Sequence, residues 1–516
     1  MDQKEILNFC LERGILLDKE VLALLSEATD FDSARLMIER IKERTHQKII
    51  TKSLFVESMK QFTPILSDDK RIGFEKLRIR LGLELEISKE YSKSEEVQSD
   101  TINENGVTIS SFPTNSNKKV EVEDFTGYFR NRLFKMKSIL QSQPNLKNLV
   151  SINKISGDRQ GFSIICIVSE KRVTKNGNIL LDVEDLTGGM RVLINQNKPQ
   201  IYKKAEEIAL DSVIGITGSG NKEILFANDV FFPDSFLVEK KKSPIEEYAL
   251  FVSDVHYGSK LFLKESFNKF IDYLNGKIPN TPEVEKIKYL FLMGDIVAGI
   301  GIYPEQERDL EINDLEEQFK GFAQLIDKIR KDITIIISPG NHDCVRLMEP
   351  QPILDKKFAE PLYNMKNVML ATNPCYVKIG EKNGFSGIDV LVYHGFSYPF
   401  YADNIPFLIQ ADAMNAPDKI MAYLLKNRHL APTHSSNQYF PLAEDPLVID
   451  KVPDIFVSGH THKCGVSFYN NTLLISGAAW ESKTDFQEKM GNEPDFCKVP
   501  IFNLKTGGVK ILDFEI

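Results

Sequence analysis

Short apolar runs in the second half of the chain end abruptly in polar clusters. Their length and richness in β-branched residues are typical of buried strands. The five runs cover Tyr248 to Val252, Ile287 to Met293, Ile333 to Ile337, Ile388 to Tyr393 and Ile455 to Val457. Helical spacing appears between them, most clearly over Leu310 to Ile329. This alternation predicts an α/β fold from about residue 243 to 516, with polar residues delivered at the carboxyl ends of strands.

Three further regions precede this part of the chain. Residues 1–80 show helical spacing and predict a small helical interaction domain. Residues 81–122 are rich in Ser, Glu, Asn and Lys, and predict a flexible linker because they offer little apolar surface to bury. Residues 123–242 contain five or six short strand patterns with hairpin turns, which predict a barrel of the oligonucleotide-binding (OB) type. The chain is therefore predicted to be a multidomain α/β protein.

Basic and aromatic residues alternate where the predicted barrel domain begins. Arg130, Arg132 and Lys135 lie among Phe129 and Phe134. Such a pattern can follow a single nucleic-acid strand, although a helix with one solvated and one buried face shows it more often.

Composition restricts the cellular compartment and the binding partners of the protein but does not indicate which reaction it catalyses. The 516 residues carry 64 Lys and Arg against 73 Asp and Glu, a formal net charge of −9, so no overall positive field attracts nucleic acid. The six cysteines form no CxxC pair, which favours free thiols in a reducing compartment. No signal peptide or membrane-spanning run is visible, so a cytoplasmic protein that does not bind membranes is expected.

The polar clusters at the five strand ends contain the residue types that bind divalent metals. Seven of the eight histidines lie between His256 and His462. The candidate ligands are Asp254, His256, Asp295, Asn341, His394, His460 and His462. Two ions held about 3.5–4 Å apart need a bridging carboxylate, and Asp295 is placed to supply it as a catalytic residue. His342 is predicted to be catalytic, protonating a leaving oxygen, and not to be a ligand.

The donor set restricts the metal. Mixed carboxylate, amide and imidazole ligands favour Mn²⁺, with Zn²⁺, Fe²⁺ and Mg²⁺ as alternatives. Arg428 and His429 are weaker candidates, as contacts to a substrate phosphate; a structured surface loop is the alternative for His429.

The strand-end clusters resemble those of the calcineurin-like metallophosphoesterase superfamily. Its pattern of D-x-H, G-D, G-N-H-D/E, H and G-H-x-H is matched in order by Asp254, His256, Asp295, Asn341, His342, His394, His460 and His462. The resemblance covers about 260 residues and implies a β-sandwich flanked by helices and a two-metal phosphoesterase activity.

A narrower resemblance is to the small subunit of archaeal family D DNA polymerases. It rests on Ser253 to Lys260, Gly299 to Pro304, Arg428 to Thr433 and Val448 to Phe456, and on the order of the predicted domains. It implies a 3′→5′ proofreading exonuclease acting on the 3′ end of DNA, paired with a large polymerising subunit in a heterodimer or heterotetramer. One departure is Ala298, near which the pattern has an acidic residue, and this puts substrate contacts in doubt.

Two other functions stay open at this stage. One is a stand-alone metallophosphoesterase acting on other phosphoesters, and the other is a non-catalytic polymerase scaffold. Because ligand imidazoles must be neutral, we expect activity to be lost in acid, and chelation to abolish it.

Overall fold

The computed structural model describes the chain in two compact units, Met1–Ser94 and Glu95–Ile516. The described residues are 3–19, 21–22, 25, 35, 38–39, 41–42, 49–51, 54–55, 99–102, 106–112, 119–382 and 384–516.

The first unit contains the helical pattern predicted near the amino terminus. Helix α1 (Gln3–Glu12) buries Ile6 and Cys10, and Gly14 follows it in the left-handed conformation. Two short strands, β1 (Leu16–Leu17) and β2 (Ile49–Ile50), pair in parallel. Most of the helical domain predicted over residues 1–80 lies outside the described residues and stays a prediction.

Part of the predicted linker is folded. Strands β3 (Ser99–Ile102) and β4 (Thr108–Ser111) pair with each other, and β4 also pairs with β14 (Cys375–Ile379). Val107 and Ile109 are fully buried in the core that lies between the two main sheets. The prediction of a flexible linker over residues 81–122 is therefore wrong for residues 99–102 and 106–111.

A closed five-stranded barrel follows α6 (Val122–Gln141). Its strand order is β5-β6-β7-β9-β8, with α7 (Pro199–Glu206) between β7 and β8 in sequence. The strands are β5 (Gln160–Val173), β6 (Ile179–Asp185), β7 (Gly188–Ile194), β8 (Val213–Gly220) and β9 (Ile224–Phe231). The predicted turn between β5 and β6 is present, with Gly177 at φ +74°. The barrel is confirmed, and its assignment to the OB type stays a prediction.

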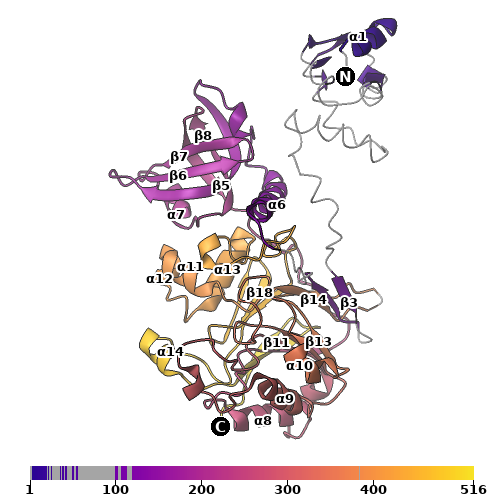
Figure 1. Ribbon diagram of the computed structural model, residues 1–516, viewed down its shortest axis with the longest axis vertical. Helices are drawn as coiled ribbons and strands as arrows, with labels where there is room; N and C mark the ends of the chain where they lie inside the picture. Colours follow the sequence, from indigo (N-terminus) through magenta and orange to yellow (C-terminus); the bar gives the residue numbers. More distant parts are fainter. Residues whose placement is uncertain are drawn as a thin grey trace. The chain divides into compact units, whose positions relative to one another are not determined.

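Two mixed sheets form the centre of the remaining chain (Figure 1). The six-stranded sheet has the order β13 (Val368–Leu370), β12 (Thr334–Ser338), β11 (Ile287–Met293), β10 (Tyr248–Val252), β19 (Lys498–Asn503) and β20 (Val509–Asp513). The seven-stranded sheet has the order β17 (Gly465–Tyr469), β18 (Thr472–Ser476), β16 (Ile455–Ser458), β15 (Ile388–Val392), β14, β4 and β3. Residues from both sheets share one apolar core, where Phe251 and Phe291 stack with ring centroids 5.1 Å apart.

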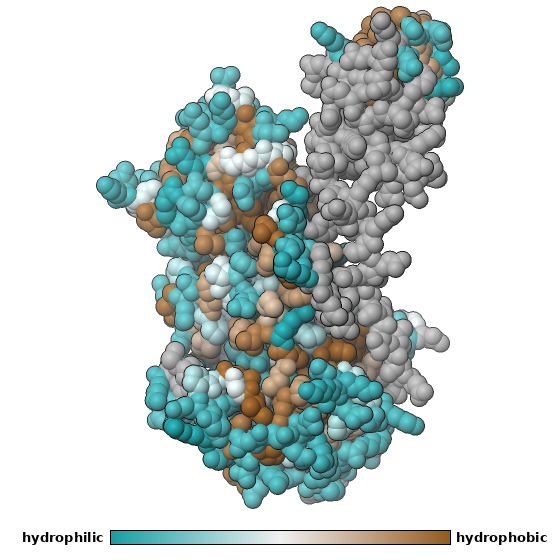
Figure 2. Space-filling view, in the orientation of Figure 1, coloured by the Kyte–Doolittle hydropathy of each residue, from teal (hydrophilic) through white to brown (hydrophobic). Residues whose placement is uncertain are grey.

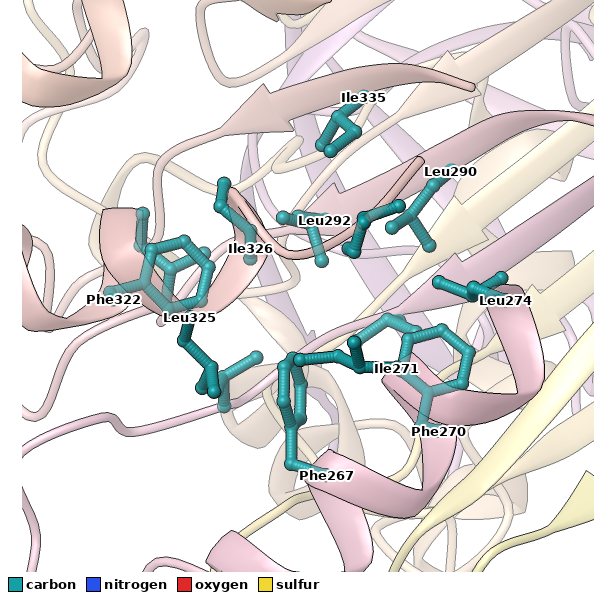
Figure 3. Packing of buried hydrophobic residues seen from close by; sticks show 14 of the residues in the cluster. Phe267, Phe270, Ile271, Leu274, Leu290, Leu292, Phe322, Leu325, Ile326 and Ile335 are labelled. Atoms are coloured by element: carbon teal, nitrogen blue, oxygen red, sulfur yellow. The ribbon is translucent and has the colours of Figure 1, made fainter. Parts of the chain in front are cut away.

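Helices cover the outer faces of this sandwich. Helices α8 (Lys264–Leu274) and α9 (Leu315–Ile326) pack on the six-stranded sheet, as Figure 3 shows for Phe267, Phe322 and Leu292. Asp314 caps α9 by accepting a hydrogen bond from the Glu317 amide, so the helix begins later than the apolar pattern suggests. Helices α11 (Tyr398–Asn404), α12 (Pro406–Gln410) and α13 (Pro417–Asn427) pack with residues of the seven-stranded sheet. Two shorter helices are α10 (Lys356–Tyr363) and α14 (Asp485–Met490).

A buried ion pair joins α6 to the sandwich. Arg132 is 1% exposed, and its Nε donates to Asp445 Oδ2 at 2.7 Å while its guanidinium also donates to the Pro432 carbonyl. His429 donates to the same carboxylate at 2.9 Å. The helix predicted here is confirmed, but Arg132 faces the protein interior and is not available to a nucleic acid.

Replacing Arg132 with Met should destabilise the protein by about 3–5 kcal/mol, because Asp445 would stay charged and buried without its cationic partner, keeping the hydrogen bond from His429. Urea unfolding followed by the fluorescence of Trp480, the one tryptophan of the chain and fully buried, measures the change. Lys135→Met is the matched control on the same helix: Lys135 pairs with Glu444 and Asp450, which are both more than half exposed. That control should cost less than about 1 kcal/mol. An equal loss of unfolding free energy in both variants would contradict the conclusion that the buried pair of Arg132 and Asp445 stabilises the fold.

The visible surface is mainly polar, with separate apolar areas (Figure 2). None of the helices in the described part of the chain combines the length and apolar character that crossing a bilayer requires.

Candidate metal centre

The predicted ligands come from the carboxyl ends of strands in both sheets. Strands β10, β11 and β12 are parallel neighbours in the six-stranded sheet and precede Asp254, Asp295 and Asn341. Strands β15 and β16 are parallel neighbours in the other sheet and precede His394 and His460. The predicted strands are confirmed to within one residue at each end. The site therefore lies where two facing sheets end, not along the edge of one open sheet.

Three groups of side chains bring their donor atoms within 4.8 Å of one another. The groups are Asp254, His256 and His462; His256, Asp295 and His342; and Asp295, His394 and His460. Asn341 joins the last group, because its Oδ1 lies 3.1 Å from His394 Nε2. Asp295 belongs to two groups, as a carboxylate that bridges two ions must. The structure thus brings together every predicted ligand, while their ligation of metal stays a prediction.

The closest approaches inside the cluster fit a bound cation. His256 Nε2 lies 3.1 Å from His462 Nε2, and His462 Nε2 lies 3.5 Å from Asp254 Oδ1. Asp295 Oδ2 lies 3.1 Å from His394 Nε2. Two imidazole nitrogens and a carboxylate oxygen this close together can all bind one divalent cation placed between them.

Backbone groups fix the orientation of the imidazoles. His394 Nδ1 donates to the Met293 carbonyl at 2.9 Å, which leaves Nε2 directed at Asp295 and Asn341. His342 Nδ1 donates in the same way to the Ala298 carbonyl at 2.9 Å. Such outer contacts set the tautomer of a metal-binding histidine. Ala298, where the sequence departs from the family pattern, therefore contributes through its backbone.

The ligand loops adopt backbone conformations that side chains other than glycine rarely take. Positive φ angles between 49° and 69° occur at Asp254, His256, Asp295, His460 and His462. Each costs on the order of 1 kcal/mol, and such residues concentrate at functional sites. Five in one cluster indicate that the surrounding structure, and not local preference, sets these loops.

Asp343 ties two of the ligand loops together. Its buried carboxylate accepts hydrogen bonds from the amides of Ile296 at 2.8 Å, Val297 at 3.1 Å and Gly340 at 2.7 Å. A Cβ atom at Gly340 would lie 2.2 Å from Asp295 Oδ1, so only glycine allows this approach. The G-N-H-D pattern contains Asp343, but the sequence alone did not separate this positioning role from ligation.

Burial and mutual charge shift the titration of the cluster. Burial raises the pKa of Asp254 to about 7. Burial lowers the pKa of His460 to about 3 and that of His462 to about 4, so both imidazoles are neutral ligands at neutral pH. Burial would also lower the pKa of His394, but the Asp295 carboxylate beside it raises that pKa to about 10. Without metal, His394 therefore keeps a proton that compensates Asp295.

Metal affinity should rise about tenfold per pH unit between pH 7 and 9, because a cation must displace the proton of His394. The sign follows from the raised pKa of His394: lower pH favours the protonated form, which cannot ligate. Calorimetric titration with Mn²⁺ in two buffers of different ionisation enthalpy at pH 8 should show about one proton released. His394→Asn should bind more weakly and lose this pH dependence. A dissociation constant of the parent that is independent of pH in this range would contradict the expectation.

Two further side chains at the site were not predicted from the sequence. Glu481 is 9% exposed and accepts a hydrogen bond from Ser259, three residues after His256. Gln487 of α14 contacts His462 Nδ1 at 2.8 Å and so holds that ring. Neither lies in a strand-end motif, and no local pattern marks them.

The predicted substrate contacts of Arg428 and His429 are not supported by their surroundings. They are 6% and 1% exposed, and Arg428 donates to the carbonyls of Ile449 and Asp450. His429 donates to Asp445 and accepts from the Ala431 amide. These contacts stabilise the fold and engage both ring nitrogens of His429 and two of the nitrogens of Arg428. A contact of either residue with substrate stays a prediction.

Comparisons with known proteins agree with this geometry. Residues 249–465 match the family model for the B subunit of DNA polymerase alpha/epsilon. The DNA polymerase II small subunit of Pyrococcus abyssi is 37% identical over 410 residues, which are 77% of this chain and 64% of that protein. The DNA polymerase II small subunit of Methanothermobacter thermautotrophicus is 35% identical over 401 residues, covering 77% of this chain and 80% of that protein. The chain thus spans less than two thirds of the Pyrococcus relative.

Solved structures were also compared. A novel archaeal phosphodiesterase covers 51% of this chain and 98% of its own length, at 12% identity and a TM-score of 0.26. A likeness this low carries no argument, and the fold described above rests on strand order and packing.

Proposed function

The chain belongs to the family of archaeal DNA polymerase II small subunits, and we propose that it is the 3′→5′ proofreading exonuclease of a two-subunit replicative polymerase. In this proposal the substrate is a DNA strand with a free 3′ end. The partner is a large polymerising subunit, in a heterodimer or heterotetramer. Because the net charge is −9, we expect that subunit to provide most of the affinity for DNA.

One observation carries the enzymatic part of the proposal: the donor atoms form three overlapping groups, and Asp295 belongs to two of them, one with His256 and His342 and one with His394 and His460. A scaffold protein has no need for this arrangement, since buried imidazoles, carboxylates and strained loops all cost free energy of folding. Their retention together is expected where they bind metals for chemistry. The donor set contains no thiolate and fits two divalent ions, with Mn²⁺ preferred.

The residues have distinct roles in the proposed hydrolysis. Asp254, His256 and His462 would hold one ion, Asn341, His394 and His460 the other, and Asp295 both. Two ions bound there would polarise the phosphoryl group and activate a water molecule.

His342 has a separate role, as the acid for the leaving 3′ oxygen. The Ala298 carbonyl accepts the Nδ1 hydrogen bond, so the proton that His342 would transfer is a second one, carried on Nε2.

Incubation of the full chain, alone and with its large subunit, with single-stranded DNA labelled at either end tests the proposal. With Mn²⁺, we expect mononucleotide release from the 3′ end and complete inhibition by chelation. Hydrolysis of small phosphodiesters without hydrolysis of DNA would instead show a stand-alone phosphoesterase. No hydrolysis in either preparation would show a non-catalytic scaffold.

A further inference from the structure

Residues 299–310 form a crest, as we call this segment, that connects two of the ligand loops. At its beginning, Gly299 lies so close to His342 that a Cβ atom would be 2.2 Å from the His342 carbonyl oxygen. At its end, Leu310 pairs with Ser259, and the Lys260 amide donates to the Asp309 carbonyl at 2.9 Å. The crest therefore starts beside the proposed acid and returns beside the loop that carries His256.

Two buried glutamines fix the backbone of the crest. Gln306, 2% exposed, accepts from the Ile302 amide and donates to the Ala298 carbonyl, both at 2.9 Å. Gln318 of α9, fully buried, accepts from the Gly299 amide at 2.9 Å and donates to the Ile312 carbonyl at 2.7 Å. Buried amides that satisfy backbone groups at both ends of a segment hold it in one conformation.

The crest presents apolar side chains to solvent. Ile300 is 41% exposed and Tyr303 is 42% exposed. The Tyr303 hydroxyl donates to Asp309 Oδ2 at 3.0 Å, which fixes the ring. The crest is well anchored, yet the side chains of Ile300 and Tyr303 remain exposed. They form a rigid apolar surface on the segment that connects the two ligand loops.

Burial and acidic neighbours keep the Tyr303 hydroxyl protonated, as a hydrogen-bond donor. Burial raises the pKa of the Tyr303 phenol, and the carboxylates of Asp309 and Glu481 raise it further. Burial also raises the pKa of Glu481, while Ser259 and His342 oppose that rise. The hydrogen bond from Ser259 ties Glu481 to the loop that carries His256.

We propose that Tyr303, with Ile300, is the stacking surface for the unpaired bases at the 3′ end of the DNA strand. The inference rests on the proposed exonuclease function and assigns a specificity residue to it. The crest carries Glu305, Glu307 and Asp309 but only Arg308 as a basic residue, and Arg308 pairs with Glu305. Such a surface repels phosphates and suits the faces of bases. Stacking on an aromatic ring accepts every base, as proofreading of any mismatch requires.

The test compares two single-stranded oligonucleotides, one ordinary and one with abasic residues at its last two 3′ positions. Tyr303→Ala in the full chain with Mn²⁺ should lower kcat/KM about tenfold on the ordinary strand and leave the abasic strand unchanged. Tyr303→Phe keeps the ring and should retain most of the activity. Phe468→Ala is the matched control, since Phe468 is 54% exposed on the edge strand β17; it should change neither rate.

Equal losses on both strands would overturn the proposal, because Tyr303 would then act on the structure and not on a base. No loss on either would overturn it too, and would suggest a contact with a protein. Binding of the two strands, measured in a His342→Ala background with Mn²⁺, separates this proposal from the exonuclease function. If the parent protein cleaves no DNA, the proposed exonuclease function is wrong. If Tyr303→Ala also leaves the binding preference for the ordinary strand unchanged, the proposed stacking surface is wrong as well.

Discussion

Replacing Asp295 with Asn should reduce exonuclease activity by on the order of a thousandfold or more. Asp295 belongs to two of the three donor groups, and its Oδ2 lies 3.1 Å from His394 Nε2. Burial alone would raise its pKa, but the neighbouring histidines, His394 first, hold that pKa well below its usual range, so the residue provides a full negative charge. Asn has the same size and can still accept the hydrogen bond that the His342 amide donates at 2.7 Å. Asp295→Asn therefore removes the negative charge of the side chain and little else.

Two measurements make this test specific. Release of a 3′ label from single-stranded DNA with Mn²⁺ gives the activity, and elemental analysis after dialysis gives the metal content, which should fall from two ions per chain to one or none. Asp327→Asn is the matched control, because Asp327 is 64% exposed at the end of α9 and outside the cluster. Full activity of Asp295→Asn with both metals bound would refute the bridging role.

Replacing His342 with Ala should lower the rate by about 10²–10⁴-fold while both metals stay bound. The reason is that His342 is assigned to protonate the leaving 3′ oxygen and not to bind metal. The ring of His342 packs edge-on against that of His256 with centroids 4.7 Å apart, and its Nδ1 is occupied by the Ala298 carbonyl. Nε2 is therefore the one nitrogen available for the reaction.

A substrate with a sulfur leaving atom distinguishes this role from a structural one. A 3′-bridging phosphorothiolate linkage needs no protonation when it breaks, so the variant should recover most of its activity on it. His434→Ala is the control, since His434 is exposed and outside the three ligand groups. If His342→Ala loses a metal ion, His342 is a ligand; if it degrades ordinary DNA like the parent, it has no catalytic role.

The sequence predicted the parts of the molecule that local pattern determines. The apolar runs predicted both ends of β10 and β11 correctly. The polar residues that follow each strand predicted the cluster, because a short strand places the next residue at the end of the sheet independently of distant contacts. The turn at Gly177 was predictable for the same reason, since its conformation depends on the glycine itself.

Contacts distant in sequence account for the rest. Arg132 and Asp445 are 313 residues apart, so no local signal shows that this arginine is buried. Asp450 and Asp445, which are partners of Arg428 and His429, likewise lie many residues away along the chain. The sequence does not reveal strands β3 and β4 because an edge hairpin needs few apolar residues. Within residues 106–112, Val107 and Ile109 are the buried side chains.

The β3–β4 hairpin also determines where the chain can be cut. A shortened protein that begins at residue 123, the sequence-based start of the barrel domain, would lack the partners of Tyr376, Val377 and Lys378 on β14. Its unpaired edge would be open to strands from other molecules, and aggregation would follow. Residues 1–94 precede β3 in the sequence, so a force applied to them is transmitted through the β3–β4 hairpin to β14 and β15. His394 directly follows β15, and a mechanical load on the amino-terminal unit would therefore be borne by the sheet that positions half of the metal cluster.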